Sequence, residues 1–163
     1  MKEYEPRKNG DKALSVVMIP LFAALTAVGS QFSIPFGTVP VTLQMFFVFL
    51  AGYMLKPLNA FMSMLLYLVL GAIGIPVFAN FSAGFMYLVG PTSGYLWAFP
   101  LTAYVIATLK NRNLFVAGLT GLSIVYLLGW FVLGMSIHTF QKAFLVGVLP
   151  FIAFDVGKLF VAI

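Results

Sequence analysis

The sequence predicts an all-α integral membrane protein, built as a bundle of six transmembrane helices. Composition is the first observation: 62% of the 163 residues are hydrophobic and 8% are charged, whereas soluble domains are typically about 45–50% apolar and about 25% charged. So few charged side chains cannot cover the surface of a water-soluble fold. The second observation is spacing, because the apolar residues fall into six runs that approach the roughly 20 residues needed to cross hydrocarbon.

The six predicted spans follow one another along a single transmembrane domain, residues 13–163, after a charged segment at residues 1–12. They cover residues 13–32, 41–55, 58–75, 92–109, 114–133 and 149–163. The second is short for a crossing. Pro150 suits the first turn of the sixth helix, where a missing N–H costs little, and a helix that starts there is too short at Ile163 for a full crossing. The sixth helix is therefore expected to be truncated.

Basic residues predict the orientation of the bundle. Seven of the nine lie before the first span or in the two tight turns after the second and fourth spans: Lys2, Arg7, Lys8, Lys12, Lys56, Lys110 and Arg112. Cytoplasmic loops carry an excess of Lys and Arg, so both termini are expected in the cytoplasm, with the protein in the lipid bilayer. The chain offers no basic face on a soluble fold, which argues against a nucleic-acid partner.

One pair of opposite charges stands inside the last apolar run. Asp155 and Lys158 are three residues apart, so they share one face of a helix. A charge at the bilayer centre costs roughly 2.5–3.5 kcal/mol on insertion scales, and pairing alone rarely compensates for dehydration. Two interpretations stay open: a structural salt bridge that fixes helix register, or a polar floor where the carboxylate accepts and the ammonium donates hydrogen bonds to a ligand. A proton relay is disfavoured, because Asp155 is the only acid after Asp11.

Further polar and aromatic side chains gather on the predicted outer side. The candidates for a ligand pocket are Gln44, Asn80, Thr92, Tyr95, Phe36 and Tyr87. Thr92 has an ordinary alternative role as a helix cap, and the tyrosines have one in the interfacial aromatic belt. Gln44 and Asn80 are stronger candidates, since a buried amide needs hydrogen-bond partners.

The residues argue against catalysis and against a metal or other cofactor. His138 stands without a carboxylate or a second histidine beside it, and no pair of catalytic acids can be assembled. The segment VGK at residues 156–158 lacks the glycine spacing and the following Ser or Thr of a P-loop. We therefore expect a protein that is no enzyme and that obtains any ATP-driven work from a partner.

Four segments of the chain form a set: VPVTLQ (39–44), LGAIGIPVFA (70–79), GPTSGYLWAFP (90–100) and GVLPFIAFDVGK (147–158). In order and spacing this set resembles the BioY family, the biotin-binding S components of energy-coupling-factor (ECF) vitamin transporters. The resemblance covers nearly the whole chain.

The resemblance implies a six-helix S component in a prokaryotic cell membrane that captures biotin in an outward-facing pocket under the loop between helices one and two. It implies as partners a transmembrane coupling subunit and two ABC-type ATPases. Asp155, Lys158 and Asn80 are implied to contact the ligand. Ala23 and Ala27, small residues four apart that allow close helix approach, resemble the motif that packs on the coupling subunit.

Three alternatives remain at this stage. The chain is also compatible with an S component for a different vitamin, with a stand-alone secondary carrier that couples transport to an ion through Asp155 or Lys158, and with a purely structural membrane subunit.

Overall fold

The structure is a computed structural model that describes residues 6–35 and 39–163, with side chains from Lys12 onward. Over these residues the chain is largely helical. The α-helices are α1 (Pro6–Gln31), α2 (Gln44–Met54), α3 (Pro57–Ala72), α4 (Ser93–Leu109), α5 (Leu114–Ser136), α6 (Phe140–Gly147) and α7 (Phe151–Ala162). Two short 3₁₀ helices, η1 (Ala79–Phe81) and η2 (Phe85–Leu88), and two short strands, β1 (Ser33–Ile34) and β2 (Val41–Thr42), lie in the connections.

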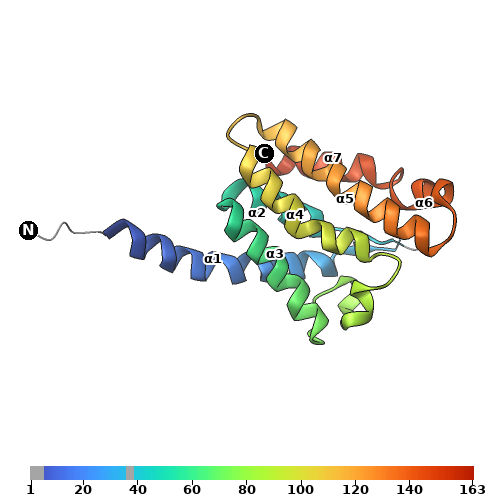
Figure 1. Cartoon of the computed structure of the whole chain (residues 1–163), viewed down its shortest axis with the longest axis horizontal. Helices are drawn as coiled ribbons and strands as arrows, with labels where there is room; N and C mark the ends of the chain where they lie inside the picture. Colours follow the sequence, from blue (N-terminus) through green and yellow to red (C-terminus); the bar gives the residue numbers. More distant parts are fainter. Residues whose placement is uncertain (1–5, 36–38) are drawn as a thin grey trace, which may run out of the picture.

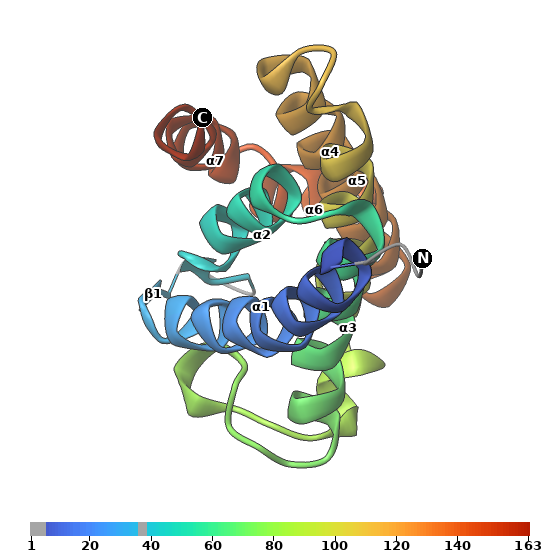
Figure 2. The ribbon, with the colours of Figure 1, turned by 90° about the vertical axis from the view of Figure 1, so that its left-hand side faces the viewer.

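Successive helices run in alternating directions, which gathers the connections at the two ends of the bundle (Figure 1). The turns between α2 and α3 and between α4 and α5 lie at the end where the chain also terminates, and α1 extends beyond the bundle on this side. The strands, η1, η2 and α6 lie at the opposite end, and Figure 2 shows the bundle turned by 90°. The basic turns and the long connections are therefore at opposite ends.

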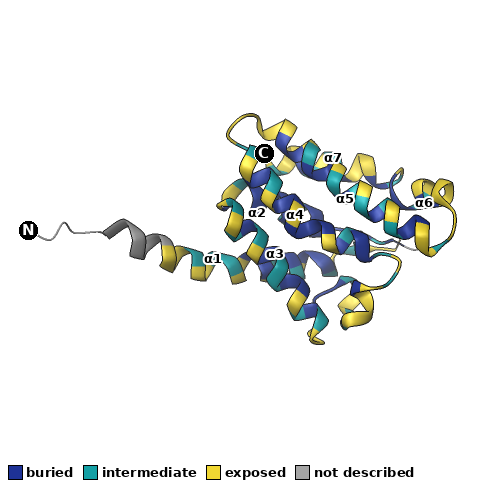
Figure 3. Ribbon diagram, in the orientation of Figure 1, coloured by how far each residue is buried: buried dark blue, intermediate teal, exposed yellow. Residues whose placement is uncertain are grey.

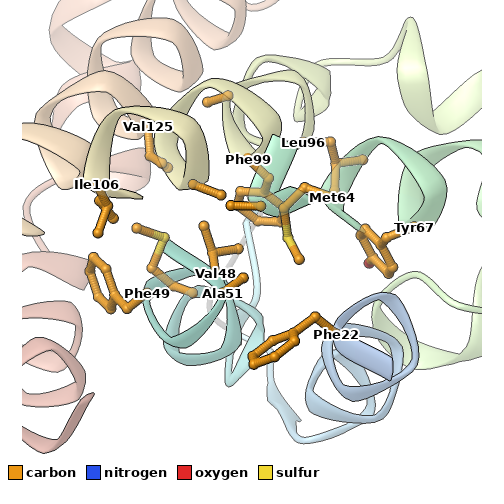
Figure 4. Close-up of a cluster of buried hydrophobic side chains, with 14 of the residues drawn as sticks. Phe22, Val48, Phe49, Ala51, Met64, Tyr67, Leu96, Phe99, Ile106 and Val125 are labelled. Atoms are coloured by element: carbon orange, nitrogen blue, oxygen red, sulfur yellow. The ribbon is translucent and has the colours of Figure 1, made fainter. Parts of the chain in front are cut away.

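The core lies between α1, α2, α3, α4 and α5. Val48, Phe49, Met64, Tyr67 and Ile106 are each 0% exposed (Figure 4). Outside this core, large apolar side chains are exposed along most helices (Figure 3). In water such a surface would aggregate, whereas lipid chains accept it.

Two helical segments are long and apolar enough to cross a membrane, Lys12–Gln31 in α1 and Leu114–Ser136, which is α5. A third crossing is possible if α6 and α7, which meet at a bend of 44°, act as one broken span. The helices α2, α3 and α4 are apolar but shorter. The all-helical character agrees with the sequence prediction, while helix length by itself does not establish six crossings.

Several element boundaries differ from those predicted. Helix α1 begins at Pro6, ahead of the predicted span at residue 13, and α2 begins at Gln44 because the preceding residues 41–42 pair with β1. The segment between the fifth and sixth predicted spans contains a helix that was not predicted, α6. This helix forms because Ala143 and Gly147, four residues apart, are buried on one face, while the Trp130 indole donates to the Phe140 carbonyl at 2.9 Å.

Lys110 links the turn between α4 and α5 to the turn between α2 and α3, at the end of the bundle that carries the basic residues. Its ammonium donates to the carbonyls of Tyr53 at 2.9 Å and Leu55 at 2.7 Å, which belong to the C-terminal end of α2, where helix carbonyls lack intrahelical partners. A cation is also favourable at the negative end of a helix dipole.

Replacing Lys110 by methionine is expected to destabilise the protein by about 2 kcal/mol, because charge-assisted hydrogen bonds contribute about 1.5–3 kcal/mol. The apparent Tm in detergent should fall by about 4–8 °C for a protein of this size. Arg112→Met is the matched control, since Arg112 is exposed in the same turn. Equal losses in the two variants would contradict the role given to Lys110.

Candidate functional site

A cavity of about 370 Å³ opens at the end of the bundle that carries the long connections. Its lining comes from the β1–β2 region, α2, the segment around η1 and η2, α4, α5 and α7. Small-molecule sites are typically clefts of about 300–1,000 Å³ with apolar walls and a few placed polar groups. This cavity has the size and the mixed lining of such a site.

Asp155 and Lys158 lie on the cavity side of α7. The Lys158 Nζ is 2.6 Å from Asp155 Oδ1, as their spacing in the sequence predicted. Asp155 Oδ2 accepts a hydrogen bond of 2.8 Å from the Tyr126 hydroxyl of α5, and Lys158 donates at 2.7 Å to the Thr42 carbonyl of β2. Each carboxylate oxygen can accept a second bond and the ammonium has a third donor, so the pair retains hydrogen-bonding capacity for a ligand.

Gln44, at the start of α2, forms a second polar group on the cavity wall. Its Oε1 accepts a bond of 2.8 Å from the Thr42 hydroxyl, and its Nε2 donates to the Tyr67 hydroxyl. The side chain is 7% exposed, so these bonds satisfy most of a buried amide. Gln44 is thus held rigidly by its neighbours, with its amide plane fixed.

The remaining wall residues come from the η1–η2 segment and from α4. Asn80 is exposed at the cavity and its Oδ1 accepts a bond of 2.5 Å from the Ser33 hydroxyl. The Tyr95 hydroxyl donates to the Gly147 carbonyl at 2.7 Å, which fixes its ring as a wall. Tyr87 and Thr92 also line the cavity.

Seven of the predicted pocket residues therefore meet in one cavity, although they come from four separate stretches of the chain. They are Asp155, Lys158, Asn80, Gln44, Tyr95, Thr92 and Tyr87. Phe36 lies outside the described residues. That these side chains bind a ligand stays a prediction.

Tyr126 is the main wall residue that was not predicted. It lines the cavity and holds Asp155. Its signal in the sequence is weak, because it is a single hydroxyl-bearing aromatic in the middle of an apolar helix, and most such tyrosines are explained by packing.

The two alanines of α1 differ in exposure. Ala23 is 1% exposed and belongs to the core, while Ala27 is partly buried and packs against it. The exposed side of α1 carries Leu21, Ala24 and Val28. Ala23 is therefore buried within the bundle, and its contact with a coupling subunit stays a prediction.

Comparison with known proteins adds independent information. The family model of the BioY family matches residues 5–163. A probable biotin transporter BioY of Pyrococcus horikoshii is 48% identical over 147 residues, which is 90% of each chain. The biotin transporter BioY of Thermotoga maritima is also 48% identical over 147 residues, with 87% of each chain covered.

The chain belongs to the BioY family.

A crystal structure agrees with this assignment at the level of the fold. It is that of the S-component for biotin from an ECF-type ABC transporter, and it matches with a TM-score of 0.85 at 26% identity, over 94% of this chain and 89% of that one. The relatives are transporters and the matched structure is a transport subunit. This BioY-family chain is accordingly a membrane transport protein and not an enzyme. Among the described residues no group of three or more His, Cys, Asp and Glu side chains could hold a metal.

Proposed function

We propose that this protein is the substrate-capture S component of an ECF-type importer and that it binds biotin in the cavity beside α7. The observation that carries the proposal is the Asp155–Lys158 pair, which lines a 370 Å³ cavity and is not sealed among apolar side chains. The homology to biotin transporters supports the identity of the ligand.

The chemistry of biotin fits this lining. Its ureido ring carries two N–H donors and one carbonyl acceptor, and its thiophane ring and valeryl chain are apolar. Asp155 offers carboxylate acceptors, while Lys158 and Asn80 offer donors. The rings of Phe78, Tyr95 and Phe99 provide apolar wall.

The proposal places six crossings in the membrane, with α6 and α7 together forming the last and both termini cytoplasmic. Two features support it: the basic turns lie at one end, as the excess of cytoplasmic Lys and Arg requires, and the cavity opens at the other. Biotin would then enter from outside the prokaryotic cell, beneath the loop that joins β1 to β2. That loop includes the predicted contact Phe36.

Transport in this proposal depends on a transmembrane coupling subunit and two ABC-type ATPases, because the chain has no P-loop of its own. Helix α1 remains the proposed contact with the coupling subunit. Its exposed face carries Leu21, Ala24 and Val28, and the small residues that allow close helix approach, Ala23 and Ala27, would reach a partner only if α1 turned.

The direct test is a biotin titration of the purified protein in detergent, beside a panel of other water-soluble vitamins. We expect saturable binding of biotin at one site and a raised apparent Tm, because a ligand that binds only the folded state stabilises it. Tighter binding of another vitamin would assign the chain to a different substrate. Uptake that persists without any ATPase partner and stops with a protonophore would instead indicate an ion-coupled carrier.

A further inference from the structure

The segment that carries Asn80 has an unusual backbone. Two successive residues other than glycine, Asn80 and Phe81, have positive φ angles of 58° and 56°. This left-handed region is tolerated by Asn, but for a bulky residue such as Phe it is a genuine outlier. Backbone of this kind persists only where the surrounding structure holds it.

Gln31, the last residue of α1, provides that restraint from outside the segment. Its Nε2 donates to the Phe78 carbonyl at 3.1 Å, and its Oε1 accepts from the Phe81 N–H at 2.8 Å. The two bonds lie on either side of Asn80 in the chain, so one side chain fixes the backbone before and after it. Gln31 is itself anchored, since its Nε2 also donates to the Ser30 hydroxyl at 2.6 Å.

A second contact from the same region sets the direction of the Asn80 amide. Ser33 in β1 donates its hydroxyl to Asn80 Oδ1 at 2.5 Å. With the oxygen occupied, the Nδ2 end is the one that retains donors for a ligand. Asn80 lies on the same cavity as Asp155, whose carboxylate is an acceptor, so the site presents donors and acceptors from different walls.

We propose that Gln31 is a positioning residue of the binding site: by holding the strained segment 78–82, it makes Asn80 present its amide N–H groups to an acceptor oxygen of the ligand. This inference rests on the proposed function for its ligand. The restraint on the segment is a property of the protein alone and can be measured without biotin.

The first experiment measures the restraint directly. The chain contains no cysteine, so a Met86→Cys variant carries a single nitroxide label on η2, where Met86 is 75% exposed. Gln31→Met keeps the length of the side chain and removes both hydrogen bonds. We expect a sharper, more mobile electron paramagnetic resonance spectrum in Gln31→Met, and no change in the matched control Gln141→Met, which is exposed on α6. An unchanged spectrum in Gln31→Met would overturn the inference.

The second experiment asks whether Gln31 acts through Asn80. Gln31→Met should weaken biotin binding about tenfold, the size of effect expected from losing one to two net hydrogen bonds. In an Asn80→Ala background the same substitution should have little further effect, because the amide that it positions is gone. An undiminished tenfold loss in that background would show that Gln31 acts elsewhere. If Gln31→Met does not fold, Gln31→Glu takes its place in the same cycle, because it removes the Nε2 donor to the Phe78 carbonyl and keeps an acceptor for the Phe81 N–H.

The two experiments separate this inference from the proposed function. Wild-type protein that fails to bind biotin while Gln31→Met still mobilises the label would reject biotin as the ligand and support the restraint. Wild-type protein that binds biotin with an affinity indifferent to Gln31→Met would support the proposed function and reject the positioning role.

Discussion

Replacing Asp155 by asparagine is expected to weaken biotin binding about ten- to a hundredfold. The carboxylate accepts bonds from Lys158 and Tyr126 and lines the cavity with its remaining lone pairs. An amide presents one acceptor oxygen where the carboxylate presents two, and it leaves the Lys158 ammonium without its counter-charge. A charge-assisted hydrogen bond contributes about 1.5–3 kcal/mol, which corresponds to the expected loss in affinity.

The measurement is a biotin titration of wild type and variant in detergent, after each is shown to be folded by a cooperative thermal transition. Asp11→Asn, which makes the same change of charge near the N-terminus, is the control and should bind as wild type does. A folded Asp155→Asn protein with wild-type affinity would mean that the pair is a structural salt bridge only.

Replacing Gly94 by alanine is expected to destabilise the bundle by about 3 kcal/mol, the upper part of the usual range for overpacking. An added Cβ would lie 2.3 Å from the Leu128 carbonyl oxygen and 2.9 Å from the Val132 Cβ. The first of these atoms belongs to the backbone of α5 and cannot rotate away. Helix α4 must then shift away from α5, and α4 carries Tyr95 on the cavity wall.

The apparent Tm of Gly94→Ala should therefore fall by about 6–12 °C, and biotin binding should weaken with it. Gly157→Ala is the matched control, because nothing lies within 4 Å of a Cβ added there. In the interior of α7 that substitution should leave stability unchanged or raise it by about 0.5–1 kcal/mol, since alanine has the higher helix propensity. Equal Tm values for the two variants would contradict the close approach of α4 and α5.

The prediction from sequence succeeded where local spacing was sufficient. Asp155 and Lys158 are three residues apart on one helix, and the ion pair of 2.6 Å follows from that geometry. Gln44 and Asn80 were selected because a buried amide needs hydrogen-bond partners; Gln44 is buried and both amides have partners, while their contact with a ligand stays a prediction. These arguments need only the periodicity of a helix and the cost of an unsatisfied polar group.

The sequence did not predict hydrogen bonds between residues that lie far apart in the chain. Lys158 donates to Thr42, 116 residues away, and Gln31 reaches Phe78, 47 residues away. Nothing in the local sequence marks these contacts. The burial of Ala23 in the core was missed for the same reason, because an apolar helix in a membrane shows no contrast between the face that meets lipid and the face that meets protein.

The sequence by itself determined that the protein lies in a lipid bilayer and that its fold is helical. It also identified the polar and charged side chains that need a partner inside hydrocarbon. Composition and local spacing are sufficient for these, because transfer energies belong to the individual side chains. Only the tertiary structure decided which of those residues share one cavity, that Tyr126 holds Asp155, and that Gln31 holds the segment of Asn80. Those contacts depend on how the helices pack. Because nearly every helix face in this chain is apolar, no hydrophobic pattern within one helix shows which face meets another helix. The packing is instead fixed by how the side chains of distant segments fit together.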